Sequence, residues 1–122
     1  MGLRYNVRRE FFSSVFKDEW TSPKIITAKL MTRVARKFLI RGEVQGVGYR
    51  FFAQRAAARH QVTGYVRNCS DGTVEALAEG SPVDVEEFKK DLVTGPQWAS
   101  VGQVEEISLE PTGQYGSFLI ER

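Results

Sequence analysis

The segment KFLIRGEVQGVGYRFFAQRAAARH, residues 37–60, contains the pattern on which the fold prediction depends. Its first five residues, 37–41, form a short apolar run with strand character that Gly42 closes. A glycine-rich turn follows over 43–48, and residues 49–60 are good helix formers that include four alanines. The segment therefore predicts a strand that leads through a tight turn into a helix.

The residues that follow predict a second strand–helix unit and two closing strands. A strand over 62–67 contains Gly64, and the turn residues 68–72 connect it to a half-buried strand over 73–79 in which apolar and polar residues alternate. Ser81 and Pro82 begin a second helix as N-cap and first helical residue, and Gly95-Pro96 ends it. Strands over 101–109 and 117–120 complete the chain. This order predicts an α+β fold of βαββαβ type: a mostly antiparallel sheet of four to five strands with two helices on one face.

The composition excludes several classes of protein. The chain has 122 residues with 42% hydrophobic and 26% charged residues, which is typical of one globular domain. Its single cysteine, Cys69, and single histidine, His60, are too few for a disulfide framework or an ordinary zinc site. No apolar run approaches the roughly 20 residues of a membrane span, and no secretory signal follows the N-terminus. We expect a cytoplasmic protein without a bound metal.

The charge is uneven along the chain. Residues 1–36 carry eight basic and three acidic side chains, a formal charge of +5, whereas the remaining residues have a formal charge of −3. A basic arm of this kind could touch nucleic acid or lipid, but its charges are scattered and show no clean amphipathic period. We expect residues 1–35 to be a flexible N-terminal extension and residues 36–122 to form the domain.

The turn between the first strand and the first helix has features of an anion site. Three glycines in seven residues allow backbone N–H groups to converge, and the following helix N-terminus adds positive potential. Arg50 lies in the first helical turn, where its guanidinium could pair with phosphate oxygens. Taken alone, the glycines favour a plain strand–helix turn with a solvated arginine. The spacing matches neither a Walker loop nor a dinucleotide-binding fingerprint.

Two strings together resemble the signatures of the acylphosphatase family. The first is GEVQGVGYR, residues 42–50, and the second is GYVRNCSDGTV, residues 64–74; Gly95-Pro96 with Ala99 and Val101 resembles the family's loop before its fourth strand. The resemblance covers about residues 36–122 and implies a ferredoxin-like sandwich. It also implies hydrolysis of the carboxyl–phosphate anhydride of acyl phosphates by water, with no metal, cofactor or covalent intermediate.

By this resemblance, two side chains carry the catalysis. Arg50 matches the arginine that binds the substrate phosphate, and Asn68 matches the asparagine that orients the attacking water. The phosphate-binding backbone cradle matches Gln45, Gly46, Val47, Gly48 and Tyr49. An asparagine amide has both a donor and an acceptor, so it can hold one water in a fixed orientation. We expect a monomer whose partners are an acyl phosphate and water, without nucleic acid or membrane.

For the other candidate side chains we expect structural or surface roles outside the catalytic site. We expect His60 to cap the first helix or lie on the surface, Cys69 to have no nucleophilic role because no base accompanies it, and Glu43 to be a solvated loop charge. Asp71 is interpreted as turn chemistry, and Trp98 is expected to pack.

Two rival functions stay open at this stage. An RNA- or anion-binding module is one, although the negative body and the lack of an RNP-like string argue against it. The other is an acylphosphatase-like accessory domain of a larger carbamoyl-transferring maturation protein, which would be accompanied by zinc-finger cysteine pairs. The fold alone does not separate these functions.

Overall fold

A computed structural model describes residues 32–122 of the chain. The expected extension therefore lies almost entirely outside the described residues. The elements are, in chain order, β1 (Val34–Glu43), α3 (Tyr49–Arg59), β2 (Thr63–Asn68), β3 (Val74–Gly80), α4 (Pro82–Thr94), β4 (Ser100–Leu109) and β5 (Phe118–Glu121).

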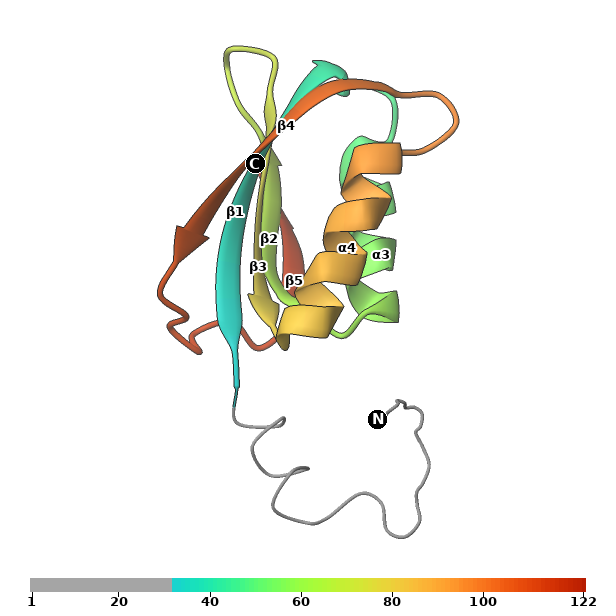
Figure 1. The fold of residues 1–122 in the computed structure, drawn as a ribbon. Helices are drawn as coiled ribbons and strands as arrows, with labels where there is room; N and C mark the ends of the chain where they lie inside the picture. The colour runs from blue at the N-terminus through green and yellow to red at the C-terminus, as the bar shows by residue number, and fades with distance from the viewer. Residues whose placement is uncertain (1–31) are drawn as a thin grey trace, which may run out of the picture. The chain divides into compact units, whose positions relative to one another are not determined.

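Five strands form one sheet in the order β4-β1-β3-β2-β5, and both helices cover the same face of it (Figure 1). Strand β3 is central and pairs antiparallel with β1 and with β2, and β4 pairs antiparallel with β1. Among the strands of residues 32–122, only β5 pairs in parallel, with β2. The predicted α+β ferredoxin-like fold is confirmed, including the mostly antiparallel sheet and the helices on one face.

The two predicted helices begin where their local sequences indicated. Gly48 is the N-cap of α3, and His60 is its C-cap, as expected. In α4 the hydroxyl of Ser81 accepts a hydrogen bond from the backbone N–H of Asp84 at 3.1 Å, so the predicted N-cap is also confirmed.

Strand β1 is longer than its apolar run. It extends from Val34, which lies opposite Gly80 of β3, to Glu43, which lies opposite Ser100 of β4. Gly42, expected to close the strand, lies within it at a shift of the β4 register. The backbone of β1 pairs with β3 on one side and β4 on the other, whatever its side chains are. A prediction based on a run of apolar residues therefore misses the ends of the strand.

The strand predicted at residues 73–79 is present as β3, but the prediction that it is half-buried is wrong. Every residue of β3 is buried, the carboxylates Glu75 and Glu79 included. The central position of β3 explains part of this, because neighbouring strands cover both of its edges. The face away from the helices is covered as well: Tyr65 and Arg67 of β2 donate hydrogen bonds to the Glu75 carboxylate.

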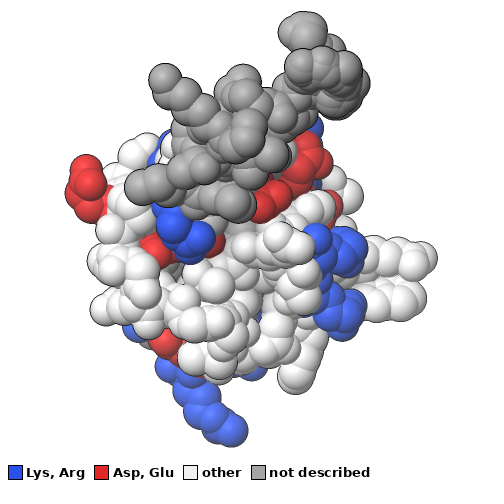
Figure 2. Space-filling view, turned by 90° about the horizontal axis from the view of Figure 1, so that it is seen from below, with Lys and Arg blue, Asp and Glu red and all other residues white. Residues whose placement is uncertain are grey.

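The surface of the described residues carries charges of both signs. On the face shown in Figure 2, basic and acidic side chains lie scattered among uncharged ones. Trp98, which was expected to pack, is instead 72% exposed in the loop between α4 and β4. Within residues 32–122, no helix has the length and apolar character needed to cross a membrane.

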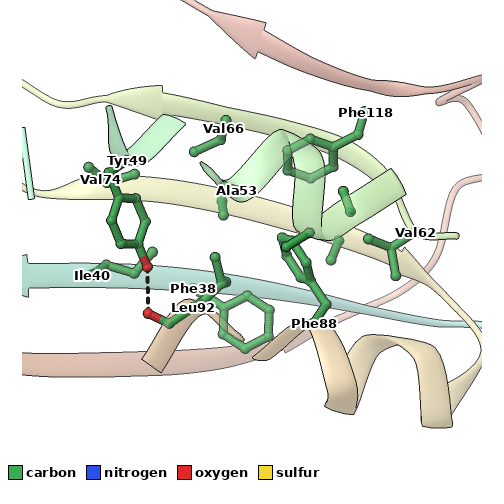
Figure 3. Close-up of a cluster of buried hydrophobic side chains, with 14 of the residues drawn as sticks. Phe38, Ile40, Tyr49, Ala53, Val62, Val66, Val74, Phe88, Leu92 and Phe118 are labelled. Carbon is green, nitrogen blue, oxygen red and sulfur yellow. Dashed lines mark hydrogen bonds between the residues drawn. The ribbon is translucent and has the colours of Figure 1, made fainter. Parts of the chain in front are cut away.

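The core lies between the helices and the sheet (Figure 3). Helix α3 contributes Ala53, Ala56 and Ala57, all fully buried, and these small side chains allow the helix to approach the sheet closely. Larger side chains fill the rest: Phe88 packs edge-on against Phe38 and Phe118, with ring centroids 6.3 and 5.4 Å apart. The core therefore joins α4 to strands on either side of β3.

A buried carboxylate holds the crossover between β4 and β5. Glu79 is 1% exposed, and its side chain accepts hydrogen bonds from the backbone N–H groups of Thr112 and Gly113 at 3.0 Å each and from the Thr112 hydroxyl at 3.1 Å. Burial alone would raise the pKa of Glu79, but the hydrogen bonds from Thr112 and Gly113 outweigh it and hold the pKa below its usual value. The fold therefore stabilises the ionised form of Glu79. Its hydrogen bonds hold the loop between β4 and β5, and β5 then pairs with β2 at the edge of the sheet.

We predict that Glu79→Ala lowers the free energy of unfolding by about 1–3 kcal/mol, because it removes the charged acceptor shared by the backbone N–H groups of Thr112 and Gly113 and by the Thr112 hydroxyl. Because the folded-state pKa is lowered, this contribution is present above the unfolded pKa and is lost as the pH falls through the folded value. Denaturant unfolding of wild type and variant at pH 7 and below pH 4 measures it. Glu105→Ala, which removes an exposed ion pair with Arg41, serves as the control. If the difference in the free energy of unfolding between Glu79→Ala and wild type does not change with pH, the role of the ionised carboxylate is contradicted.

Candidate functional site

Sheet topology brings the two sequence motifs together at the carboxyl ends of β1 and β2. Strands β1 and β2 both pair antiparallel with β3, so they run parallel to each other. Ile40 of β1 and Asn68 of β2 lie opposite the same residue, Val74. The turn that follows β1 and the side chain that ends β2 therefore meet, although they are far apart in the sequence.

A cavity of about 80 Å³ lies where they meet. It contains the two predicted catalytic residues, Arg50 and Asn68, and three of the predicted cradle residues, Gly46, Gly48 and Tyr49. Its full lining is Val44, Gly46, Gly48, Tyr49, Arg50, Phe51 and Asn68. The structure thus brings the arginine and the asparagine of the two motifs to one small space.

The turn adopts a backbone conformation that requires glycine at two positions. Gly46 and Gly48 have φ angles of +75° and +79°, in the left-handed region that other residues adopt at a cost. A Cβ atom at either position would meet nothing within 4 Å, so the constraint is conformational and the space beside both residues is open. The turn then leads directly into α3, whose first backbone N–H groups have no partner within the helix and carry the positive end of its dipole. No acidic residue lies in that first turn to neutralise it.

Arg50 lies in the first turn of α3, and its side chain reaches the last strand. Its Nη1 donates a hydrogen bond to the backbone carbonyl of Glu121 in β5 at 3.4 Å. Among residues 32–122, no carboxylate side chain forms an ion pair with Arg50, whereas Arg59 and Arg67 each have one. The guanidinium is therefore oriented by a neutral acceptor and keeps its positive charge available to the cavity.

Asn68 presents an unsatisfied acceptor. Its Oδ1 is buried and has no hydrogen-bond partner in the described part of the protein. Buried side-chain oxygens are normally hydrogen-bonded, and an exception of this kind at a cavity points to a group that binds there. A water molecule or a substrate atom in the cavity would supply the missing donor.

Gln45 and Val47 do not line the cavity, although both belong to the predicted cradle. Val47 packs against the hydrophobic core, and the Gln45 side chain donates hydrogen bonds to two backbone carbonyls in the turn after β2. The prediction concerned their backbone groups, and the structure adds that their side chains hold the turn in place.

Tyr49 anchors the start of α3 from the core side. Its ring is 1% exposed, and its hydroxyl donates a 2.6 Å hydrogen bond to the carbonyl of Leu92 in α4 (Figure 3). Burial raises the pKa of Tyr49 above its usual value, so the hydroxyl keeps the proton that it donates. This bond ties the helix that carries Arg50 to the second helix.

Phe51 is an exposed lining residue to which the sequence analysis assigned no role. It is 61% exposed, directly after Arg50, and leaves an apolar ring beside the cavity. The helical pattern alone could have indicated it, because Phe51 lies off the face formed by Ala53, Ala56 and Ala57.

The remaining candidates lie outside the cavity lining. His60 caps α3 and its Nε2 lies 2.7 Å from an Asp91 carboxylate oxygen of α4, while Glu43 is exposed at the end of β1. Asp71 accepts hydrogen bonds from the Thr73 N–H and hydroxyl at 3.1 and 2.7 Å, which confirms its role in the turn. Within residues 32–122, no cluster of three or more His, Cys, Asp or Glu side chains is arranged to hold a metal ion.

Known proteins are similar to this chain over most of its length. The family model described as acylphosphatase matches residues 36–120. The chain is 49% identical over 86 residues to an acylphosphatase of Solibacter usitatus, which covers 70% of this chain and 88% of that relative. The crystal structure of an acylphosphatase from Bacillus subtilis matches with a TM-score of 0.71 and 29% identity, over 73% of this chain and 99% of that one. A structure of full-length HypF in its phosphate- and nucleotide-bound form matches with a TM-score of 0.67 and 26% identity, over 75% of this chain but 12% of that one.

Proposed function

The chain belongs to the acylphosphatase family, and we propose that Arg50 binds the phosphoryl group of an acyl phosphate while Asn68 orients the water that attacks it. Proteins of this family are hydrolases acting on acid anhydrides, and this protein is an acylphosphatase: it hydrolyses the carboxyl–phosphate anhydride to a carboxylate and inorganic phosphate. One observation supports the assignment of roles. Within residues 32–122, a guanidinium with no carboxylate partner and a buried amide oxygen with no hydrogen-bond partner line the same cavity.

Phosphate binding falls to Arg50 and the turn before it. The guanidinium presents a planar fork of N–H donors that matches two phosphate oxygens, and the backbone N–H groups at the start of α3 supply further donors. Gly46 and Gly48 leave open space beside the turn, where a side chain would otherwise project. These donors stabilise the charge on the phosphoryl oxygens as the bond to the carboxylate breaks.

Water activation falls to Asn68. Its Oδ1 accepts a hydrogen bond from the water, which holds one lone pair of the water oxygen toward phosphorus. The water oxygen forms a bond to phosphorus, the bond from phosphorus to the bridging oxygen breaks, and the electron pair leaves with the carboxylate. The cavity lining contains no carboxylate and no histidine, so the proton of the water passes to a phosphate oxygen.

The reaction runs without a metal ion in this proposal. Arg50 and the turn supply the positive charge that a metal would otherwise bring to the phosphoryl group. The carboxylate is a good leaving group, and this reduces the need for a stronger electrophile.

Charge and thiol content support the proposed partners and location. The body of the protein has a formal charge of −3, and the face in Figure 2 mixes both signs, which supports a small-molecule substrate over nucleic acid. The single thiol, Cys69, is compatible with the reducing cytoplasm, where we place a monomeric enzyme.

Replacing the arginine tests the phosphate site. Arg50→Ala is expected to lower kcat/KM for a small acyl phosphate roughly 100- to 1000-fold, because it removes a charged donor to the phosphoryl group. Arg55→Ala, one turn further along α3 at an exposed position, is the matched control and should keep wild-type activity. Near wild-type turnover in folded Arg50→Ala would rule out the role of Arg50.

Replacing the asparagine tests the water site. Asn68→Ala is expected to lower kcat roughly 100-fold while the affinity for inorganic phosphate changes little, since the orientation of water matters in the transition state. Titration calorimetry with phosphate beside steady-state kinetics separates the two effects, with exposed Ser70→Ala as the control. If phosphate affinity collapses while kcat survives, Asn68 is a binding residue and the water role is wrong.

Chelation tests the metal-free mechanism. Phosphate release from the acyl phosphate should be the same before and after dialysis against EDTA, because Arg50 and the turn supply the positive charge. A loss of activity in EDTA that Mg²⁺ or Zn²⁺ restores would contradict it.

A further inference from the structure

The side chain of Gln45 connects the two halves of the site. Its Nε2 donates hydrogen bonds to the backbone carbonyls of Cys69 and of Thr73, each at 2.8 Å. An amide nitrogen has two hydrogens, so both are used. The contacts span 24 and 28 residues of sequence and join the turn after β1 to the turn after β2.

The turn that accepts these bonds is rigid in its own right. Cys69 N–H donates to the carbonyl of Thr73 at 2.9 Å, and Gly72 N–H donates to the carbonyl of Cys69 at 3.2 Å. The Thr73 hydroxyl and N–H both bond to Asp71, which lowers the pKa of that carboxyl and favours its ionised, acceptor form. The residues 69–73 therefore behave as one unit, and a bond to two of its carbonyls holds the whole unit.

The other end of the connection is equally well fixed. Val44, directly before Gln45, is 1% exposed in the core, and Val47 packs against the same core. The turn that leads to Arg50 is thus anchored on both sides of Gln45. The Gln45 side chain therefore connects two turns that are each fixed by contacts of their own.

Asn68 immediately precedes the unit that Gln45 holds. Its Oδ1 has no partner among the described residues, so no hydrogen bond at that atom fixes where it points. The position of Oδ1 in the cavity therefore depends on the backbone at residues 68 and 69, which is held by pairing with Val74 on one side and by the Gln45 bond to Cys69 on the other.

We propose that Gln45 is a positioning residue, which fixes the distance between the water site at Asn68 and the phosphate site at Arg50 by holding the turn 69–73 against the turn 44–48. This inference rests on the water-orienting role proposed for Asn68. Gln45 does not line the cavity, so it acts through Asn68 and does not itself touch the substrate. In-line attack on phosphorus is sensitive to such placement, because small displacements of a reacting group cost large factors in rate.

Two variants remove the connection in different ways. Gln45→Met keeps the length of the side chain and loses both donors. Gln45→Glu keeps the shape but places a carboxylate against two carbonyl oxygens; once protonated at low pH, it donates one hydrogen bond again. Gln54→Met is the matched control, since the Gln54 amide also donates to a backbone carbonyl, that of Phe118 at 3.3 Å, away from the cavity.

A double-mutant cycle between Gln45 and Asn68 distinguishes positioning from a general loss of stability. We expect Gln45→Met to lower kcat roughly 10- to 100-fold in the wild-type background, with a much smaller change in KM and in phosphate affinity. In the Asn68→Ala background, the same substitution should change kcat by less than about twofold, because the water site it positions is already gone. Gln54→Met should leave kcat close to wild type in both backgrounds.

Equal losses of kcat from Gln45→Met in the two backgrounds would overturn the proposal and make Gln45 a general structural residue. Wild-type kcat in Gln45→Met would overturn it as well. The role of Asn68 is tested separately by the single variant: if Asn68→Ala keeps kcat, the proposed water site fails, whatever Gln45 does.

A pH profile keeps the test available where Gln45→Met is too unstable to assay. The kcat of Gln45→Glu relative to wild type should rise as the pH falls through the pKa of the introduced carboxyl, because the protonated form restores a donor. A ratio that stays flat or falls at low pH contradicts the proposal, provided that circular dichroism shows the variant folded over the range.

Discussion

The pairing of β1 and β2 with the two sides of β3 is the constraint on which the site depends. Two strands that are both antiparallel to a third run parallel to each other, so their carboxyl ends lie at the same edge of the sheet. Ile40 and Asn68 lie opposite the same Val74, which brings the turn before α3 and the end of β2 together. The arginine and the asparagine of an acylphosphatase thus share a cavity because of the register of the sheet.

Buried polar groups extend this arrangement to the rest of the molecule. Tyr49 ties the start of α3 to Leu92 in α4, and Glu79 ties the crossover that brings β5 to the edge beside β2. The carbonyl of Glu121 in β5 then orients Arg50. Each of these is a hydrogen bond between distant segments, which is costly to break where no water can replace the lost partner.

The chemistry of the cavity follows from what its lining contains. Arg50 and the N-terminus of α3 supply positive charge, whereas the lining carries no carboxylate and no histidine. In the proposed mechanism such a site stabilises phosphoryl charge and positions water without a strong base, which suits a substrate with a good leaving group. The hydrogen bonds of Gln45 join the two turns that carry these proposed functions.

Local sequence determined the elements and the two motifs of this protein, and tertiary structure decided how they are used. The apolar run at 37–41, the alanines of α3, the Ser81 cap and the Asp71 turn could be predicted, because propensity and capping depend on residues close in the chain. The same local patterns showed neither the burial of Glu75 and Glu79 nor the exposure of Trp98. The partners of the Gln45 amide emerged only in three dimensions, as did the buried Oδ1 of Asn68, which has no partner in the described part of the chain. Those properties depend on which distant segments meet, and sheet register and core packing decide that.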